Sequence, residues 1–219
     1  MKTVILDIDG TLVDSNDAHA HAWVAAFAGA GITVDYEKVR RLVGMGGDKL
    51  MPAVSGIESA SDRGQRISKE RGEIFKSTYL PALRPFASVR ELMERFIADG
   101  YGLAVASSAK EHELQPLLEC ARIADLIPHR TSSDDADNSK PEPDIVEAAL
   151  EKCGCDPAEA LMLGDTPYDI EAATGAGVRI VAFESGGWSR KDLGGAIAVY
   201  KDATDLLAHY DMSPFADRA

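Results

Sequence analysis

The sequence predicts an α/β fold in which a Rossmann-like, doubly wound parallel sheet carries an inserted all-helical segment. From residue 82 onward, short apolar strands alternate with helices, which implies right-handed crossovers and a parallel sheet covered on both faces. Between residues 15 and 81, helical patterns follow one another with no convincing strand between them. The chain of 219 residues, 45% hydrophobic and 27% charged, can form a large domain with a second, smaller one.

The first strand is predicted at residues 2–8, a short apolar run rich in β-branched side chains. The next element is an Ala-rich helix that starts at Ser15, a candidate N-cap, and stops at Gly31. Three further helices complete the insert, over residues 35–44, 47–54 and 61–80.

Pro81 and Pro85 mark the end of the insert, and the pattern then alternates. Helices are predicted at residues 88–100, 111–121, 143–154, 169–177 and 202–210. Strands are predicted at residues 101–108, 160–165, 178–183 and 197–200. The predicted domains are therefore a core of residues 1–14 and 82–219 and a helical domain of residues 15–81.

The net charge of −13 argues against a nucleic-acid partner, which needs a basic surface. It also means that an anionic ligand is repelled at long range, so local cations must hold it. No apolar stretch approaches the roughly 18 residues of a membrane helix, and the N-terminus shows no signal-peptide pattern. Three cysteines, Cys120, Cys153 and Cys155, are too few for a disulfide framework. We therefore expect a cytoplasmic protein with reduced thiols, no membrane or nucleic-acid partner and, by default, a monomeric state.

Acidic residues follow the first predicted strand at once. Asp7 and Asp9 are two residues apart, so in an extended chain both carboxylates face the same side, and Gly10 lets the backbone turn away. Ligands of parallel α/β sheets bind beyond the carboxyl ends of the strands. We therefore expect the same edge to gather the polar residues that follow the other strands and the lysine of the SKPEPD loop, namely Ser107, Ser108, Lys140, Asp165 and Asp169.

Each of these residues also has an ordinary structural explanation. The Asp-x-Asp-Gly-Thr segment could be turn chemistry, and Ser107 or Asp165 could cap a helix. Lys140 could be a solvated lysine. Taken together, four sites on one edge supply complementary chemistry, and we favour the joint interpretation.

That chemistry is phosphoryl transfer. Three carboxylates, from Asp7, Asp165 and Asp169, together with a backbone carbonyl suit Mg²⁺. One carboxylate can attack phosphorus and form an aspartyl-phosphate. A second can protonate the leaving oxygen, a role that needs a carboxyl group held protonated near neutral pH, which nearby like charge favours. Ser107 and Lys140 can hold the remaining phosphoryl oxygens.

Four motifs in order, DIDGTLVDS, the strand-end Ser107, SKPEPD and GDTPYDIEAA, resemble those of the haloacid dehalogenase (HAD) superfamily of phosphotransferases. The resemblance extends from Asp7 to about residue 207. It implies that Asp7 is the nucleophile and Asp9 the general acid/base. It also implies a Mg²⁺ site formed by Asp7, the main-chain carbonyl of Asp9, Asp165 and Asp169, and phosphate contacts from Gly10, Ser107, Ser108 and Lys140.

The helical insert resembles the cap of this family, which closes over the site and excludes water. Its hinges are expected near residues 13–16 and 80–85. The segment DAHAHAW is similar to the start of the cap in phosphoglycolate phosphatases and β-phosphoglucomutases. Trp23 is expected to belong to the cap core, while His19 faces either the cleft or solvent. The loop VGMGGDKL is the expected specificity loop, and the predicted cap specificity residues are His19, Gly46, Gly47 and Lys49.

The leading prediction is a Mg²⁺-dependent phosphatase that hydrolyses a small phosphorylated metabolite of the phosphoglycolate or sugar phosphate type. A β-phosphoglucomutase-like phosphotransferase is the alternative, although Gly47 stands where that resemblance would put an arginine. A phosphonoacetaldehyde hydrolase-like enzyme is suggested by MGGDK, but such enzymes replace the second acid of the first motif, here Asp9. A non-catalytic phosphometabolite sensor would be marked by loss of the acids or of Lys140, and all are present.

Overall fold

A six-stranded parallel sheet forms the centre of the protein, in a computed structural model that describes residues 2–216. Its strand order, β3-β2-β1-β4-β5-β6, is that of a doubly wound Rossmann sheet, and every neighbouring pair is parallel. The strands are β1 (Thr3–Leu6), β2 (Gly102–Ala106), β3 (His129–Thr131), β4 (Ala160–Gly164), β5 (Arg179–Phe183) and β6 (Ala198–Tyr200). The predicted fold class is confirmed.

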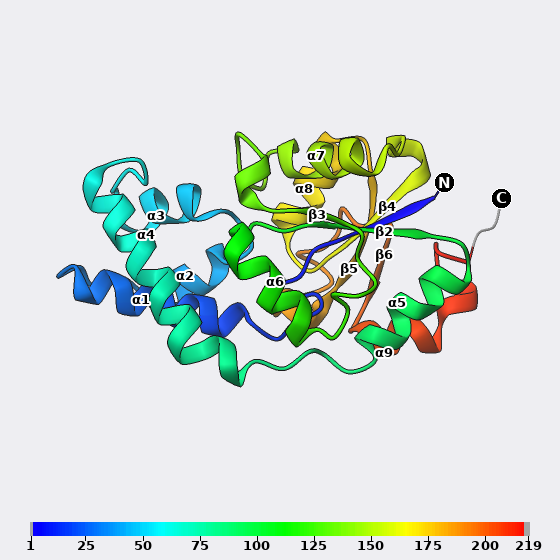
Figure 1. Cartoon of the computed structure of the whole chain (residues 1–219), viewed down its shortest axis with the longest axis horizontal. Coiled ribbons are helices and arrows are strands. Elements are labelled where there is room, and N and C mark those ends of the chain that lie inside the picture. The colour runs from blue at the N-terminus through cyan, green and yellow to red at the C-terminus, as the bar shows by residue number, and fades with distance from the viewer. Residues whose placement is uncertain (1, 217–219) are drawn as a thin grey trace.

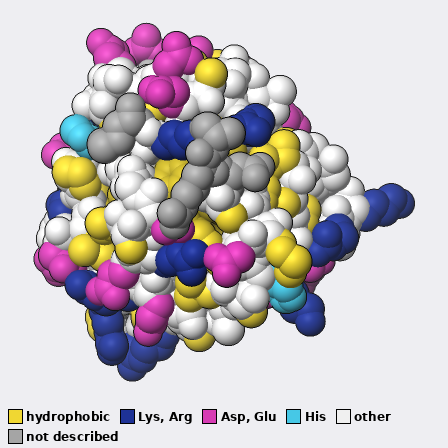
Figure 2. All heavy atoms as spheres, turned by 90° about the vertical axis from the view of Figure 1, so that its right-hand side faces the viewer, with side chains coloured by type: hydrophobic (Ala, Val, Ile, Leu, Met, Phe, Trp, Pro, Cys, Tyr) yellow, Lys and Arg dark blue, Asp and Glu magenta, His cyan; other side chains and the backbone are white. Residues whose placement is uncertain are grey.

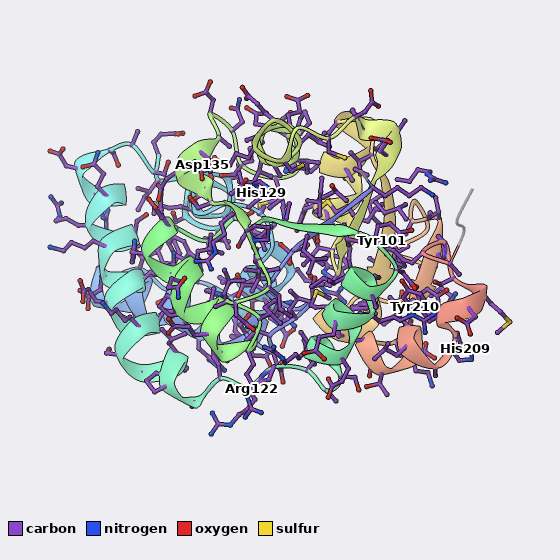
Figure 3. The ribbon with its side chains drawn as sticks, turned by 45° about the vertical axis from the view of Figure 1, so that its right-hand side comes forward. Tyr101, Arg122, His129, Asp135, His209 and Tyr210 are labelled. Carbon is purple, nitrogen blue, oxygen red and sulfur yellow. The ribbon has the colours of Figure 1, made fainter. Side chains whose placement is uncertain are left out.

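The edge strand β3 is missing from the prediction. It has only three residues, and two of them, His129 (labelled in Figure 3) and Arg130, are polar and half-buried. Such a short strand contains no apolar run, so hydropathy does not reveal it. The chain after β3 leads to the SKPEPD loop, so this strand positions the loop that carries Lys140.

Helices cover both faces of the sheet (Figure 1). One face packs against α5 (Val89–Ala98), α6 (Glu111–Cys120) and α9 (Ala203–Ala208). The other packs against α7 (Asp144–Cys153) and α8 (Pro167–Gly175). The layered arrangement leaves the carboxyl edge of the strands as the open end of the core.

The central strand β1 supplies side chains to both layers because successive strand residues point to opposite faces. Val4 and Leu6 belong to the apolar cluster beneath α5, α6 and α9. Ile5 belongs to the cluster beneath α7 and α8. All three side chains are fully buried, which explains why this segment is continuously apolar rather than alternating.

The insert forms a separate helical body, which lies to the left of the sheet in Figure 1. It has its own apolar core, in which Trp23, Phe27 and Leu50 are buried. The position expected for Trp23 is therefore confirmed. Its helices are α1 (Asn16–Gly29), α2 (Tyr36–Leu42), α3 (Gly47–Ser55) and α4 (Asp62–Ile74), followed by a π-helical turn (Phe75–Tyr79) and a 3₁₀ turn (Leu80–Ala82).

The chain crosses between the insert and the core twice, and the two crossings are bonded to each other. The backbone N–H of Asp14 donates to the carbonyl oxygen of Arg84 at 3.1 Å. Val13 and Pro85 form an isolated antiparallel bridge. The two linkers thus form a short two-stranded strap, while the boundaries of the insert at residues 15 and 81 stay a prediction.

An aromatic cluster closes the end of the core remote from the insert. The Tyr101 hydroxyl donates to the carbonyl oxygen of Phe215 at 2.9 Å, and the Phe96 ring lies 4.6 Å from that of Phe215. Tyr101 and Tyr210 are labelled in Figure 3, and Figure 2 shows this end, with acidic and basic side chains interspersed among apolar ones.

Within residues 2–216, no helix has the length and apolarity needed to cross a bilayer.

Candidate active site

Three buried carboxylates meet at the carboxyl edge of the sheet. Asp7 follows β1 and Asp165 follows the neighbouring strand β4, at the point where the strand order reverses. Asp169 reaches the same place from the first turn of α8. One oxygen from each lies within 4.8 Å of the others, and the exposed fractions of the three residues are 6%, 0% and 1%. The structure therefore brings together the three acids that the sequence predicts as metal ligands.

Lys140 lies inside this cluster and is fully buried. Its Nζ donates to Asp7 Oδ1 at 2.6 Å and to Asp169 Oδ1 at 2.7 Å. Burial lowers the pKa of Lys140, but the charges of Asp169 and Asp7 outweigh burial and raise the pKa above its ordinary value. The lysine is therefore a fixed positive charge, not a solvated one.

The pKa values of the acids show that one lysine does not neutralise them. Burial raises the pKa of Asp7 to about 7 against the opposing effect of Lys140, and Asp169 and Asp9 add to the rise. Burial, with the charges of Asp169 and Asp7, holds the pKa of Asp165 well above its ordinary value. Ionising all three acids beside one lysine leaves two excess negative charges in a buried site. A divalent cation with a preference for oxygen ligands fits this donor set.

Asp165 is held from three sides. Thr11 Oγ1 lies 2.8 Å from Asp165 Oδ1 and 3.1 Å from Asp7 Oδ2, so its single O–H can donate to either acid. Asn16 Nδ2 donates to Asp165 Oδ2 at 3.1 Å. Gly10 and Gly186 lie so close that a Cβ at either would overlap the Asp165 carboxylate, and Gly10 also has a positive φ of 82°. Glycine is thus required at position 10 for two reasons: its own turn has a positive φ, and a Cβ there would overlap the Asp165 carboxylate.

Asp169 serves the helix and the cluster at once. It is the N3 residue of a capping box at the start of α8, in which its Oδ2 accepts from Thr166 N at 2.9 Å and Thr166 Oγ1 at 2.7 Å. The same oxygen accepts from Asp165 N at 3.2 Å. Only Oδ1 then faces Lys140, so Asp169 presents one oxygen to the site.

Asp9 is held by two side chains of the insert's first turn. His19 Nε2 lies 2.9 Å from Asp9 Oδ1, and Ser15 Oγ donates to the same oxygen. The His19 ring stacks on Phe75 with centroids 4.0 Å apart. Ser15 occupies the N-cap position of α1, as expected, but its side chain makes no capping hydrogen bond to the first turn of that helix. His19 faces the cleft, which decides between the two positions considered from sequence.

Asp9 differs from Asp7 in its pKa. Burial raises the pKa of Asp9, but the charge of His19 and hydrogen bonds from His19 and Ser15 outweigh it and lower the pKa below its ordinary value. The expectation that neighbouring acids hold Asp9 protonated is therefore wrong for this conformation. Asp9 is a carboxylate here because its nearest partners are donors.

An inner chamber of about 50 Å³ lies between the core and the insert. The core lines it with Asp7, Asp9 and Ser108, and the insert lines it with His19, Trp23 and Gly47. A wider groove of about 710 Å³ adjoins it and shares Trp23, Gly47 and Ser108 as lining residues. The arrangement gives a small reaction space with a broad approach.

Other predicted site residues lie outside the lining of the inner chamber. Ser107 is fully buried, and its Oγ accepts from Ala109 N at 3.1 Å. Gly46 packs against Ser139, and Lys49 pairs with Glu142 of the core at 3.2 Å. The predicted specificity loop nevertheless lines the chamber with Val43, Gly44, Met45, Gly47 and Leu50, whereas Gly46 and Lys49 are not lining residues.

Sequence reasoning missed a charged pair at the mouth of the chamber. Arg71 of α4 and Glu113 of α6 line both the chamber and the groove, and they are joined by an ion pair of 2.9 Å. Arg71 lies four residues from both Ile67 and Phe75, which are buried. A charge on the inward-facing stripe of an amphipathic helix is the signal that could have revealed this residue.

The comparisons with known proteins agree with this site. A family profile described as haloacid dehalogenase-like hydrolase matches residues 4–183. A phosphoglycolate phosphatase of Rhodospirillum rubrum is 33% identical over 215 residues, covering 94% of this chain and 89% of that protein. A hydrolase from Pseudomonas syringae has a similar structure, with a TM-score of 0.89, 27% identity and coverage of 97% of this chain and 99% of that one.

A β-phosphoglucomutase from Clostridium difficile shares the fold at 18% identity, with a TM-score of 0.86 over 99% of this chain and 98% of that one. The predicted enzyme class, a hydrolase of the HAD phosphatase type, is confirmed by the family match and the sequence relatives. The chain belongs to the haloacid dehalogenase-like hydrolases, in the phosphoglycolate phosphatase-like group.

Proposed function

We propose that this chain is a Mg²⁺-dependent phosphatase that hydrolyses a small phosphorylated metabolite through an aspartyl-phosphate on Asp7. The observation that carries the proposal is the position of Asp7. Its carboxylate lines the chamber, Lys140 holds Oδ1, and Thr11 Oγ1 lies 3.1 Å from Oδ2. A nucleophile that is fixed in this way can attack with little loss of orientation.

In the first step an oxygen of Asp7 attacks phosphorus, and the bond between phosphorus and the leaving oxygen breaks. Asp9 gives its proton to the leaving oxygen. The negative charge of a bound phosphate would raise the pKa of Asp9 and so favour the protonated form that this step needs. His19 and Ser15 keep the Asp9 carboxyl group in position.

In the second step Asp9 takes a proton from water, and the resulting hydroxide oxygen attacks phosphorus. Phosphate leaves and Asp7 is restored as a carboxylate. The ionised state of Asp9 in this conformation is the one that a general base requires.

Asp7, the main-chain carbonyl of Asp9 and Asp165 would hold Mg²⁺, with Asp169 in contact directly or through water. The cation would neutralise the phosphoryl oxygens and stabilise the charge that they carry during transfer. Ser107, Ser108, Lys140 and Gly10 would surround the remaining phosphoryl oxygens.

The leaving group would lie between the core and the insert, against Trp23, Gly47 and Arg71. The inner chamber of about 50 Å³ is small, and the adjoining groove of about 710 Å³ has room for a short acid, as in phosphoglycolate, or for part of a sugar. Substrates of these two types are therefore proposed.

The test is phosphate release from a panel of phosphomonoesters with Mg²⁺, by the wild type and by Asp7→Asn. We expect release by the wild type and loss of release in Asp7→Asn, because an amide oxygen is a poor nucleophile. Asp14→Asn is the matched control, since Asp14 belongs to the same motif but has an exposed side chain. Substantial activity in Asp7→Asn would refute the nucleophile assignment, and an isomeric phosphate in place of free phosphate would point to a mutase.

A further inference from the structure

A buried ion pair joins the insert to the core at the mouth of the chamber. Arg71 Nη1 donates to Glu113 Oε1 at 2.9 Å and to Glu113 Oε2 at 3.1 Å. The exposed fractions of the two side chains are 13% and 3%. Both views of the ribbon place α4 and α6 side by side (Figures 1 and 3). The pair is therefore a fixed contact rather than a fluctuating surface one.

The Arg71–Glu113 ion pair lies where the inner chamber meets the outer groove. Both residues line the inner chamber together with Asp7 and Asp9, and both also line the outer groove. The Arg71 guanidinium lies 5.3 Å from the centre of the Trp23 ring, which limits its movement. A leaving group that extends from phosphorus toward the groove has to pass beside this pair.

Only one edge of the Arg71 guanidinium is occupied by Glu113. Nη1 makes both hydrogen bonds, while Nε is buried and hydrogen-bonds to no residue within positions 2–216. A guanidinium has five N–H donors in a rigid fork, so Nη2, which is not among the buried atoms, can bind an oxygen of the leaving group while Nη1 holds Glu113.

Glu113 changes which leaving groups the Arg71 guanidinium attracts. An unpaired guanidinium would attract a carboxylate or a second phosphate. With Glu113 bonded to it, the pair has no net charge, and the Glu113 carboxylate repels a second negative group that approaches the same guanidinium. A neutral hydroxyl oxygen can accept a hydrogen bond from Nη2 without this repulsion.

We propose that Glu113 is a specificity-determining residue that sets a preference for leaving groups with uncharged hydroxyls over leaving groups with a carboxylate. The proposal rests on the phosphatase function proposed above and narrows its substrate class. Glu113 acts through its bond to Arg71 and through its own charge, and it has no role at the reacting atoms, so it is not a catalytic residue.

Other charges near the pair act in the outer groove. His112 Nε2 lies 4.0 Å from Glu113 Oε1, but its side chain is 65% exposed. Lys110 lines the groove and is paired with Asp134 at 2.7 Å. These groups face solvent, so they affect approach more than the contact at the chamber mouth.

The test compares substrates that differ only in the group of interest. 2-Phosphoglycolate and 2-hydroxyethyl phosphate differ by a carboxylate against a hydroxymethyl group, as do 3-phosphoglycerate and glycerol 3-phosphate. The measured quantity is the ratio of kcat/KM for the neutral member to kcat/KM for the carboxylate member. We expect the wild type to prefer the neutral member of both pairs.

Glu113→Gln should lower this ratio about tenfold, which corresponds to about 1.4 kcal/mol, because Arg71 then keeps an uncompensated charge. Arg71→Gln should raise the ratio, because Glu113 then faces the substrate without its partner. Glu119→Gln removes the same charge from the same helix six residues further on, where it lies outside the chamber and the groove, and should leave the ratio unchanged.

Opposite shifts in the two variants separate a specificity role from a merely structural one, since loss of folding lowers both rates in a pair together. Ratios that move less than twofold in both variants, shifts in the same direction, or a wild-type preference for the carboxylate members would each overturn the proposal. Absence of phosphate release from every substrate by the wild type would instead overturn the phosphatase function.

Discussion

Replacing Lys140 with methionine tests the electrostatic account of the site most directly. Methionine has a similar length and no charge, so Asp7 and Asp169 would lose the donor that lies 2.6 Å and 2.7 Å from them. Removing one partner of a fully buried ion pair costs about 3–5 kcal/mol, because the remaining charge is left without compensation. Protonation of the acids limits the loss, since it removes the unpaired charge.

The assay is thermal unfolding of the metal-free protein in EDTA. For a chain of this size, each kcal/mol shifts the Tm by about 2–4 °C, so we expect Lys140→Met to lower the Tm by roughly 6–20 °C. The double variant Lys140→Met with Asp169→Asn should recover part of the loss, because it also removes one of the unpaired acids.

Lys49→Met is the matched control. Lys49 also pairs with a carboxylate, Glu142, but the pair lies at the surface with exposed fractions of 27% and 54%. An exposed pair contributes about 0–1 kcal/mol, so the Tm of this variant should fall by no more than about 4 °C. A loss in Lys140→Met no larger than that in Lys49→Met would refute the view that Lys140 compensates a buried cluster of acids.

Two further predictions concern the same cluster. Mg²⁺ at about a hundred times its Kd should stabilise the wild type by about 2.7 kcal/mol relative to EDTA, and Asp165→Asn should lose most of the resulting rise in Tm; an equal rise in both proteins would contradict the proposed ligand set. Gly186→Ala should lower kcat/KM at least about tenfold, because its Cβ would displace the Asp165 carboxylate. Gly29→Ala is the control and should be as active as the wild type, because no atom lies within 4 Å of the added carbon. Equal activities of the two variants would show that the position of Asp165 is not critical.

The acids of the site could be predicted from sequence because the fold itself places them. Asp7 and Asp165 follow strands that are apolar throughout, and neighbouring parallel strands end at the same edge. Lys140 was predicted only by its position in a motif. Its burial and its two partners follow from the course of the chain after β3, a strand that hydropathy does not reveal.

The contacts between the insert and the core could not be predicted in the same way. Ser15 occupies the N-cap position of α1, yet its side chain accepts no backbone N–H and instead donates to Asp9, a contact that depends on how the turn after β1 meets the insert. Arg71 and Glu113 are 42 positions apart on helices that each satisfy an ordinary amphipathic pattern. Nothing local in the sequence says which face of one helix meets which face of the other.

The two-stranded strap that joins the insert to the core has a mechanical consequence. Because the backbone of Asp14 is bonded to that of Arg84, the two linkers cannot swing independently. Two adjacent linkers that are bonded to each other would restrict the insert to rotation about one axis. An insert restricted in this way would present His19 and Arg71 to the core in one arrangement, so the precision of the site would depend on the pairing of the linkers as well as on the residues within it. Lengthening one linker with glycines would remove this restriction. His19 and Arg71 would then occupy a range of positions relative to the core, even though no residue of the chamber had changed.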